Sequence, residues 1–348
     1  MIITYVCMLI LVCSLGFLCL YKATVVDRNN DFFGITSTSA LRGFWCIIIV
    51  LVHVPQNYGN RIQDLIGSFA YIGVTFFFMT SGYGLRLGVR KEKSINNFWR
   101  KRLPKILVPM IFVNIVDFIV VGFISGSYEL SRLVRFDRWV QWLLVCYIVV
   151  WLFYRFNIMK EYKDGGIIAV LVLFSLCIFF LGDKIQVTTW TTEIYGFIWG
   201  IVLATKKCEI ENKLYPNWEK KVTVLFIVSL MLGLLYIKYK HVFFFGGYLL
   251  KIILGLVMLT FILQLTTRVQ IGNPIILFLG KISYEIYLIH GIAFYIIEKK
   301  FPEMCSGMFI LTSIILTIGI SVIVYWLSDN SNRCYLVYKG EKKWQRKN

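Results

Sequence analysis

Long apolar runs separated by short polar segments dominate the chain. Crossing about 30 Å of hydrocarbon takes about 20 helical residues, and eleven stretches approach that length. The shortest are 40–54, which ends against Pro55, and 191–204. The connecting segments are brief and leave no room for an inserted soluble domain. The predicted spans are 2–21, 40–54, 68–87, 104–124, 139–156, 166–181, 191–204, 222–238, 243–264, 274–297 and 307–327.

This pattern predicts an all-α integral membrane protein, a bundle of about 10–11 transmembrane helices with no soluble domain. The composition agrees, because 58% of the residues are apolar and 16% are charged, whereas soluble domains average about 45–50% and about 25%. The first span has no basic segment before it, and Lys22 and Arg28 follow it. These flanks favour a retained helix with its N-terminus outside over a cleaved signal peptide.

A net charge of +18 is typical of proteins that bind nucleic acid, so the distribution of the positive residues matters. When the loops alternate and the 86–105 loop is placed in the cytoplasm, 27 of the 37 Lys and Arg residues fall on the cytoplasmic side. Cytoplasmic loops of membrane proteins carry such an excess. The charge therefore indicates topology, with the C-terminus in the cytoplasm. The lipid bilayer is an expected partner and nucleic acid is not.

Nine cysteines are scattered along the chain, and most of them lie inside apolar runs. They form no C-x-x-C pair and have no histidine neighbour at the spacing of metal ligands. Cysteine in such surroundings behaves as a small apolar residue. Neither a disulfide framework nor a metal site is expected.

Polar residues inside a membrane are costly and are candidates for function. Arg42 and His53 are eleven residues apart, which is about 20° from three full helical turns, so both project from one face about 16 Å apart along the axis. Arg42 would lie at the cytoplasmic boundary and His53 in the outer half of the membrane. The alternative is an interfacial arginine and a histidine at the outer lipid boundary, each without a functional role.

Two further segments have both a structural and a chemical interpretation. Ser81 lies in a span with Gly73 and Gly82, and small residues of this kind favour close helix packing. The segment 98–109 contains four basic residues within six positions, namely Arg100, Lys101, Arg102 and Lys105. Such a cluster can bind an anion, but charge alone favours the alternative, in which it anchors a span to lipid headgroups.

A late segment carries Ser283, Tyr287 and His290 at spacings i, i+4 and i+7, so the three side chains share one helical face. His290 falls in the outer half of its span, at a depth similar to that of His53. Further polar residues inside or beside the spans have no role that the sequence assigns: Asn114, Asp117, Glu193 and Glu285.

Taken together, these segments resemble the membrane acyltransferase-3 family, in order and in approximate spacing. The resemblance covers about residues 36–327 and leaves an additional helix and cytoplasmic loop at 1–35 and a basic cytoplasmic tail at 328–348. Three positions depart from the pattern of many members, namely Ser39, Thr75 and Lys105. The matching elements are Arg42-x10-His53, Gly73-Val74 with Phe76-Phe77 and Ser81-Gly82-Tyr83, the basic run before Pro109, and Leu279-Gly280 with Ile282-Ser283-Tyr284, Ile286-Tyr287-Leu288 and His290.

The resemblance implies an integral O-acyltransferase of the cell (inner) membrane, most often an O-acetyltransferase. It would use cytoplasmic acyl-CoA, with acetyl-CoA as the expected donor, and would acylate an extracytoplasmic polysaccharide or other glycan. Arg42 and His53 would be catalytic, with His53 as general base, and Arg42, Arg100, Arg102 and Lys105 would bind the CoA phosphates. Ser81, Ser283, Tyr287 and His290 are further candidate site residues, and no permanently bound cofactor is implied.

Two other classes of protein would also explain many spans and buried polar groups. A transporter or flippase for a glycan or lipid intermediate is the first, although two repeated halves, common in transporters, are not visible in the sequence. A non-catalytic sensor or assembly subunit is the second, and no feature of the sequence favours it.

Overall fold

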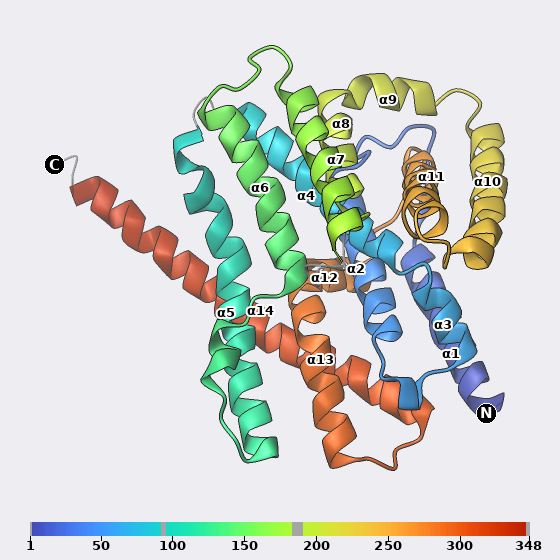
Figure 1. Cartoon of the computed structure of the whole chain (residues 1–348), viewed down its shortest axis with the longest axis vertical. Helices are drawn as coiled ribbons and strands as arrows, with labels where there is room; N and C mark the ends of the chain where they lie inside the picture. The colour runs from blue at the N-terminus through green and yellow to red at the C-terminus, as the bar shows by residue number, and fades with distance from the viewer. Residues whose placement is uncertain (1, 92–94, 183–190, 346–348) are drawn as a thin grey trace.

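The structure is a computed structural model that describes residues 2–91, 95–182 and 191–345. Lys93 and Lys184, which enter the charge count, and residues 346–348 of the predicted basic tail lie outside the described residues. Within the described chain the fold is a bundle of helices (Figure 1), and the only sheet there has two strands, β1 (Thr24–Val25) and β2 (Val269–Gln270).

The longer helices follow the predicted spans. They are α1 (Ile2–Leu20), α2 (Ile35–Val52), α4 (Tyr71–Lys91), α5 (Phe98–Ser125), α6 (Arg138–Arg155), α7 (Lys163–Leu181), α8 (Ile194–Thr205), α10 (Trp218–Tyr239), α11 (Lys251–Thr266), α12 (Pro274–Lys281), α13 (Ser283–Lys300) and α14 (Ser306–Gln345). Among the described residues, eight segments are long and apolar enough to cross a membrane, and α12 with α13 adds a ninth as a bent pair. The apolar segments Leu9–Leu20 and Ile194–Thr205 are shorter. The all-α membrane bundle is thus confirmed.

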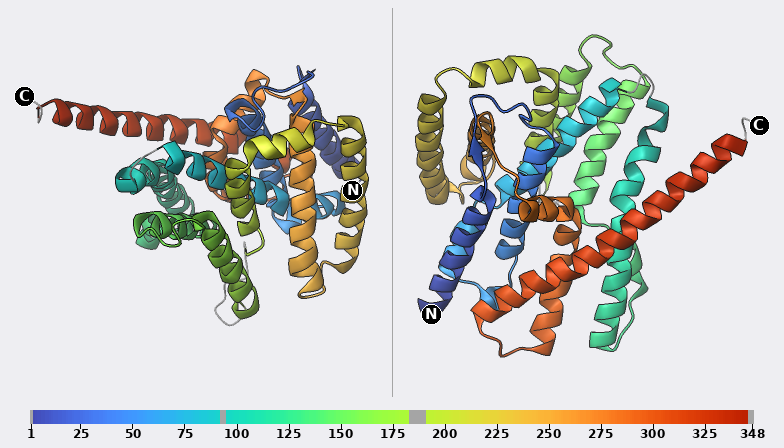
Figure 2. Two further views of the ribbon diagram at one scale, coloured as in Figure 1. Left: turned by 90° about the horizontal axis from the view of Figure 1, so that it is seen from above. Right: turned by 180° about the vertical axis from the view of Figure 1, so that it is seen from behind.

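Short elements connect these helices. They are η1 (Gln56–Tyr58), α3 (Arg61–Gly67), η2 (Ile95–Asn97), η3 (Leu130–Val134), α9 (Lys207–Leu214) and the π-helix η4 (Phe245–Leu250), which continues into α11. Helix α9 lies across the ends of α8 and α10 at the top of Figure 1. Helix α14 crosses the bundle, and its C-terminal part extends beyond the other helices in every view (Figures 1 and 2).

Loops that the alternating topology places on one side of the membrane contact each other. The 22–34 loop pairs with the 267–273 loop through β1 and β2, and Arg28 forms an ion pair with Glu211. At the opposite side, the Tyr58 hydroxyl donates to the Pro302 carbonyl. We call the first side inner and the second side outer. The alternation agrees with these contacts, while the assignment of the inner side to the cytoplasm remains a prediction from charge.

One predicted span is interrupted. The sequence suggested a continuous helix over 274–297, but α12 and α13 meet at 74°. Asn273 caps the start of α12 by accepting from the backbone N–H groups of Ile275 and Ile276, and Pro274 follows as the first helical residue. At the bend the Ser283 hydroxyl donates to the Gly280 carbonyl at 2.8 Å. This bond gives the carbonyl a partner at the point where the helical ladder breaks.

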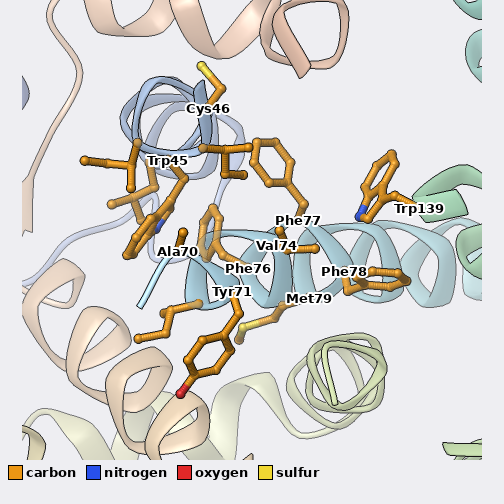
Figure 3. Packing of buried hydrophobic residues seen from close by; sticks show 14 of the residues in the cluster. Trp45, Cys46, Ala70, Tyr71, Val74, Phe76, Phe77, Phe78, Met79 and Trp139 are labelled. Carbon is orange, nitrogen blue, oxygen red and sulfur yellow. The ribbon is translucent and has the colours of Figure 1, made fainter. Parts of the chain in front are cut away.

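The core is built around α4 and the helices that contact it. Figure 3 shows Phe76, Phe77 and Phe78 of α4 between Trp45 of α2 and Trp139 of α6. On another face α4 packs against α8, where added Cβ atoms at Gly82, Gly196 and Gly200 would lie within 3.0 Å of backbone atoms of the facing helix. The close packing predicted for Gly82 is therefore present: Gly82 faces the backbone of Phe197, while Gly196 and Gly200 of α8 face the backbones of Thr75 and Met79.

A similar close approach joins α2 to α12. A Cβ atom on Gly280 would lie less than 3.0 Å from the backbone of Ser39, and one on Gly43 equally close to the backbone of Ile276. Gly43 follows Arg42 directly, so this crossing fixes the position of Arg42 relative to α12 and α13.

We predict that Gly280→Ala destabilises the protein by about 1–3 kcal/mol, because the added methyl group forces two packed backbones apart. Thermal unfolding in detergent measures this as a lower midpoint. Gly291→Ala is the matched control, since nothing lies within 4 Å of its added Cβ atom. Equal midpoints for the two variants would contradict the close crossing.

Candidate active site

Two cavities open at opposite ends of the face that α2 presents to α13. Arg42, in the first half of α2, lines a cavity of about 720 Å³ that reaches the inner side. His53, the residue that ends α2, lines a second cavity of about 440 Å³ toward the outer side. We call these the arginine cavity and the histidine cavity. The predicted pair thus lies on one helix with each member in a different cavity.

Five cationic residues and two carboxylates line the arginine cavity. Arg42 contributes a guanidinium whose Nε is buried and has no hydrogen-bond partner among the described residues. Its guanidinium carbon lies 5.5 Å from the centre of the Phe77 ring, and its nearby carboxylate is Glu285 of α13, which is buried. The cationic residues are Arg42, Arg100, Lys101, Lys105 and Lys281, and the carboxylates are Glu285 and Asp329. The excess of positive charge makes this cavity suitable for an anion.

Not every member of the predicted basic cluster faces this cavity. Arg100 and Lys105 of α5 line it, as does Ser81 of α4. Arg102 is absent from its described walls, and its guanidinium carbon lies 5.5 Å from the Phe98 ring and 5.9 Å from the Tyr147 ring. Tyr147 itself lines the cavity. Arg102 therefore supports a wall of the cavity through aromatic stacking.

The histidine cavity brings together residues from two helices that are far apart in the sequence. The rings of His53 and His290 lie with their centroids 4.9 Å apart. His53 Nδ1 is 2.7 Å from the Ile49 carbonyl oxygen, and His290 Nδ1 is 2.5 Å from the Tyr287 carbonyl oxygen. A carbonyl only accepts hydrogen bonds, so in each ring Nδ1 carries the proton. Nε2 is then the nitrogen in each ring that can offer a lone pair, as a general base requires.

Tyr287 also lines the histidine cavity, and its hydroxyl donates to Asp137 Oδ1 at 3.3 Å. Asp137 caps the N-terminus of α6 by accepting from the backbone N–H of Trp139 at 2.8 Å. Ser283 shares a helical face with Tyr287, but it is fully buried at the bend before α13 and is absent from the described walls of both cavities. Its observed role is the hydrogen bond to Gly280.

A loop that folds back over the outer half of α5 completes the histidine cavity. Asn114 Nδ2 donates to the carbonyl oxygens of Leu133 and Arg135, at 3.2 and 2.8 Å. Asp117 forms an ion pair with Arg132 at 3.1 Å. These two buried residues had no role assigned from the sequence, and the structure gives them one, which is to hold the loop 126–137 against α5. Asp137 enters the site because this loop is held there.

We predict that Asn114→Leu loosens this loop, because it removes two hydrogen bonds to loop backbone carbonyls, each of which contributes about 0.5–1.5 kcal/mol. Arg132 and Arg135 lie in the loop, so limited trypsin digestion should cut the variant there faster than the unchanged protein. Ser125→Ala is the control, since its hydroxyl is exposed and bonds only to Ser127 nearby. An unchanged cleavage rate in Asn114→Leu would contradict the clamp.

Aromatic side chains separate the two cavities. Trp139 lines the arginine cavity, and its ring centroid lies 6.0 Å from that of Tyr284 and 5.3 Å from that of Tyr287. Tyr284 belongs to the arginine cavity and Tyr287 to the histidine cavity. The Tyr284 hydroxyl donates to the Ile106 carbonyl at 3.0 Å, which ties this partition to α5. The two cavities therefore approach each other within one turn of α13.

The sequence predicted Arg42, His53, Tyr287 and His290 as candidate site residues, and the structure places them in these two cavities. It gave no prediction for Asp137, for Trp139 or for the position of Glu285 near Arg42. A signal for Asp137 exists, since an aspartate directly before an apolar helical run is a common N-cap. The contribution of Trp139 has no such local signal.

These features define a membrane-embedded helical protein with a cationic inner cavity and a histidine-containing outer cavity. A family model described as an acyltransferase domain, of the acyltransferase-3 group, matches residues 35–326. The chain belongs to this family and is an acyltransferase, which confirms the resemblance inferred from its motifs. No curated protein and no solved structure matches the chain.

Proposed function

We propose that this acyltransferase moves an acyl group, expected to be acetyl, from cytoplasmic acyl-CoA to a hydroxyl of an extracytoplasmic glycan. The observation that carries the proposal is the placement of Arg42 and His53 in two cavities that open toward opposite sides and approach each other at Trp139. This arrangement allows an anionic donor to bind on one side and the hydroxyl of an acceptor on the other.

The arginine cavity would hold the phosphates of CoA. Arg42, Arg100 and Lys105 line it without a carboxylate bound to them in the described part of the chain, and guanidinium groups are suited to bidentate contact with phosphate. Arg102 would act indirectly, by supporting the wall at Tyr147. The pantetheine arm would then extend along α2, over the rise of about 16 Å between Arg42 and His53.

The transfer step would take place at the histidine cavity. The acceptor oxygen forms a bond to the thioester carbonyl carbon while His53 Nε2 takes the hydroxyl proton. The C–S bond then breaks, and the proton on His53 passes to the departing CoA thiolate. His290 Nε2 and the Tyr287 hydroxyl line the same cavity and would orient the acceptor.

The test is transfer of radiolabelled acetyl from acetyl-CoA by the purified protein to a glycan fraction taken from the outer side of the cells that make it. Label in the glycan together with one free CoA thiol per label supports the proposal. A transporter or an assembly subunit would release no thiol, and that result would contradict it.

A further inference from the structure

A third cavity lies on the outer side, at the opposite flank of α2 from the histidine cavity. It has a volume of about 1180 Å³, and Val52 and Val54, on either side of His53, both line it. Its other walls come from α3 and from the outer ends of α4, α10 and α11, which lie near one another at the right of Figure 1. We call it the amide cavity, after Asn60 and Gln63 in its wall.

Each of these two amides uses one end on the protein backbone and leaves the other end unpartnered. Asn60 Oδ1 accepts from the Gln63 backbone N–H at 3.0 Å, and Gln63 Nε2 donates to the Leu51 carbonyl at 2.7 Å. Asn60 Nδ2 and Gln63 Oε1 are buried and have no hydrogen-bond partner among the described residues. Gln63 is only 4% exposed. Buried polar atoms are normally paired, so this donor and this acceptor indicate a ligand with hydroxyl or amide groups.

Three cationic residues from separate elements converge on the same cavity, namely Arg61, Lys240 and Lys251. The charge of Lys251 is balanced by Glu193 at 2.7 Å. Lys240 donates to the Ser68 hydroxyl at 2.9 Å, and neither it nor Arg61 forms an ion pair with a described residue. Asp64 also lines the cavity and offsets part of this charge. Two cations therefore remain available to an anionic group.

The position of these cations is unusual for a membrane protein. Ten of the 37 Lys and Arg residues fall on the outer side in the charge-based topology, and three of those ten line this one cavity. Positive residues favour cytoplasmic loops, so topology gives no reason for this grouping. A bound anionic ligand would explain the grouping, because such a ligand needs positive charge in the wall of the amide cavity.

From these observations we infer that the amide cavity binds an anionic segment of the acceptor glycan, next to the part whose reacting hydroxyl lies in the histidine cavity: sugar hydroxyls pair with Asn60 Nδ2 and Gln63 Oε1, and a carboxylate or phosphate on the glycan pairs with Arg61 and Lys240. The role as acceptor site rests on the proposed function. The hydrogen bond from Gln63 to Leu51 connects the cavity to the last turn of the helix that carries His53. A glycan is favoured over a lipid headgroup because the unpartnered amides match hydroxyl-rich ligands, whereas a headgroup phosphate would use the cations alone.

The test measures binding of two oligosaccharide probes to the full chain in phosphatidylcholine nanodiscs without acyl-CoA. The probes are hexagalacturonate and a neutral galactose hexamer. We expect hexagalacturonate to bind at least tenfold more tightly, with an affinity that falls as salt rises. Equal affinity for the two probes would overturn the inference.

Substitutions of Arg61 and Lys240 distinguish the loss of positive charge from a loss of folding. Arg61→Gln with Lys240→Gln should weaken hexagalacturonate binding at least tenfold, while Arg61→Lys with Lys240→Arg, which keeps both charges, should retain it. Lys238→Gln is the matched control, because Lys238 is exposed on the same helix end and is not among the described residues lining the cavity. Retained binding in the neutralised double variant would overturn the inference, and so would loss of binding in the charge-conserving one.

Two further measurements distinguish a glycan from a lipid headgroup and test the transfer reaction. If phosphatidylglycerol in the nanodisc abolishes hexagalacturonate binding, the cavity is a lipid headgroup site and the inference is wrong. Labelled acetyl transfer, measured in the same preparation, tests the proposed function independently. Selective binding without transfer would contradict the transfer reaction alone, whereas transfer without selective binding would contradict the anionic acceptor alone.

Discussion

His53→Ala should lower the rate of acyl transfer by about 10²–10⁴-fold, the usual contribution of a general base, while acyl-CoA binding stays unchanged. The two effects separate because His53 lines the histidine cavity and Arg42 lines the arginine cavity. His53 ends α2 and is exposed, so removing its ring leaves no cavity in the core and should not affect folding. Transfer is measured with radiolabelled acetyl-CoA, and donor binding by equilibrium dialysis.

His290 allows the role of His53 to be tested within the same cavity. Since both rings have the proton on Nδ1 and the lone pair on Nε2, His290 could act as the base in place of His53. In the proposed reaction His290→Gln raises the KM for the acceptor and changes kcat less than His53→Ala does. The reverse ranking would assign the base to His290. Lys300→Ala, at an exposed outer position, serves as the control and should leave transfer unchanged.

Arg42→Gln should weaken acyl-CoA binding about 10- to 150-fold. Hydrogen bonds between charged groups contribute about 1.5–3 kcal/mol, and each 1.4 kcal/mol corresponds to a factor of about ten. The effect is expected to be large because the Arg42 Nε is buried without a partner in the described structure, so no internal ion pair has to be broken for it to bind phosphate. Arg28→Gln is the control, since Arg28 lies on the same inner side, is paired with Glu211 and is largely exposed.

A second substitution distinguishes donor binding from charge balance. Glu285 is buried opposite Arg42, so Arg42→Gln leaves a carboxylate without its countercharge, which destabilises a buried site. Adding Glu285→Gln removes that carboxylate. If Arg42 binds the donor, the double variant regains stability but not acyl-CoA affinity. Recovery of acyl-CoA affinity in the double variant would show that Arg42 only neutralises Glu285.

The helical spacing of Arg42 and His53 was enough to predict that they share a face, because three turns of an α-helix return close to the starting direction. The position of His290 along its own span was enough to predict a depth similar to that of His53. That the two rings lie 4.9 Å apart could not be predicted, since it depends on how α2 and α13 pack. The packing in turn follows from backbone contacts at Gly43 and Gly280 and from the bend before Ser283.

The outer wall of the histidine cavity also depends on contacts that could not be predicted from the sequence. Asn114 and Asp117 were recognisable as costly polar residues in a membrane span, but their partners are in a loop that the sequence leaves without a fold. Only the folded loop places Asp137 beside Tyr287 and Trp139 between the two cavities. Local patterns therefore predicted the residues carried by helices, whereas the residues brought in by a folded loop required the structure.

The proposed reaction transfers an acyl group across the membrane to an outer glycan, with His53 as base. Mass spectrometry of extracytoplasmic glycans tests it most directly, with samples from cells that carry the unchanged protein, the His53→Ala variant at equal membrane abundance, or a deletion of the gene. We expect an acyl mass on the glycans in the first sample and its loss from the other two. The same acyl mass at the same level in the His53→Ala sample would contradict it.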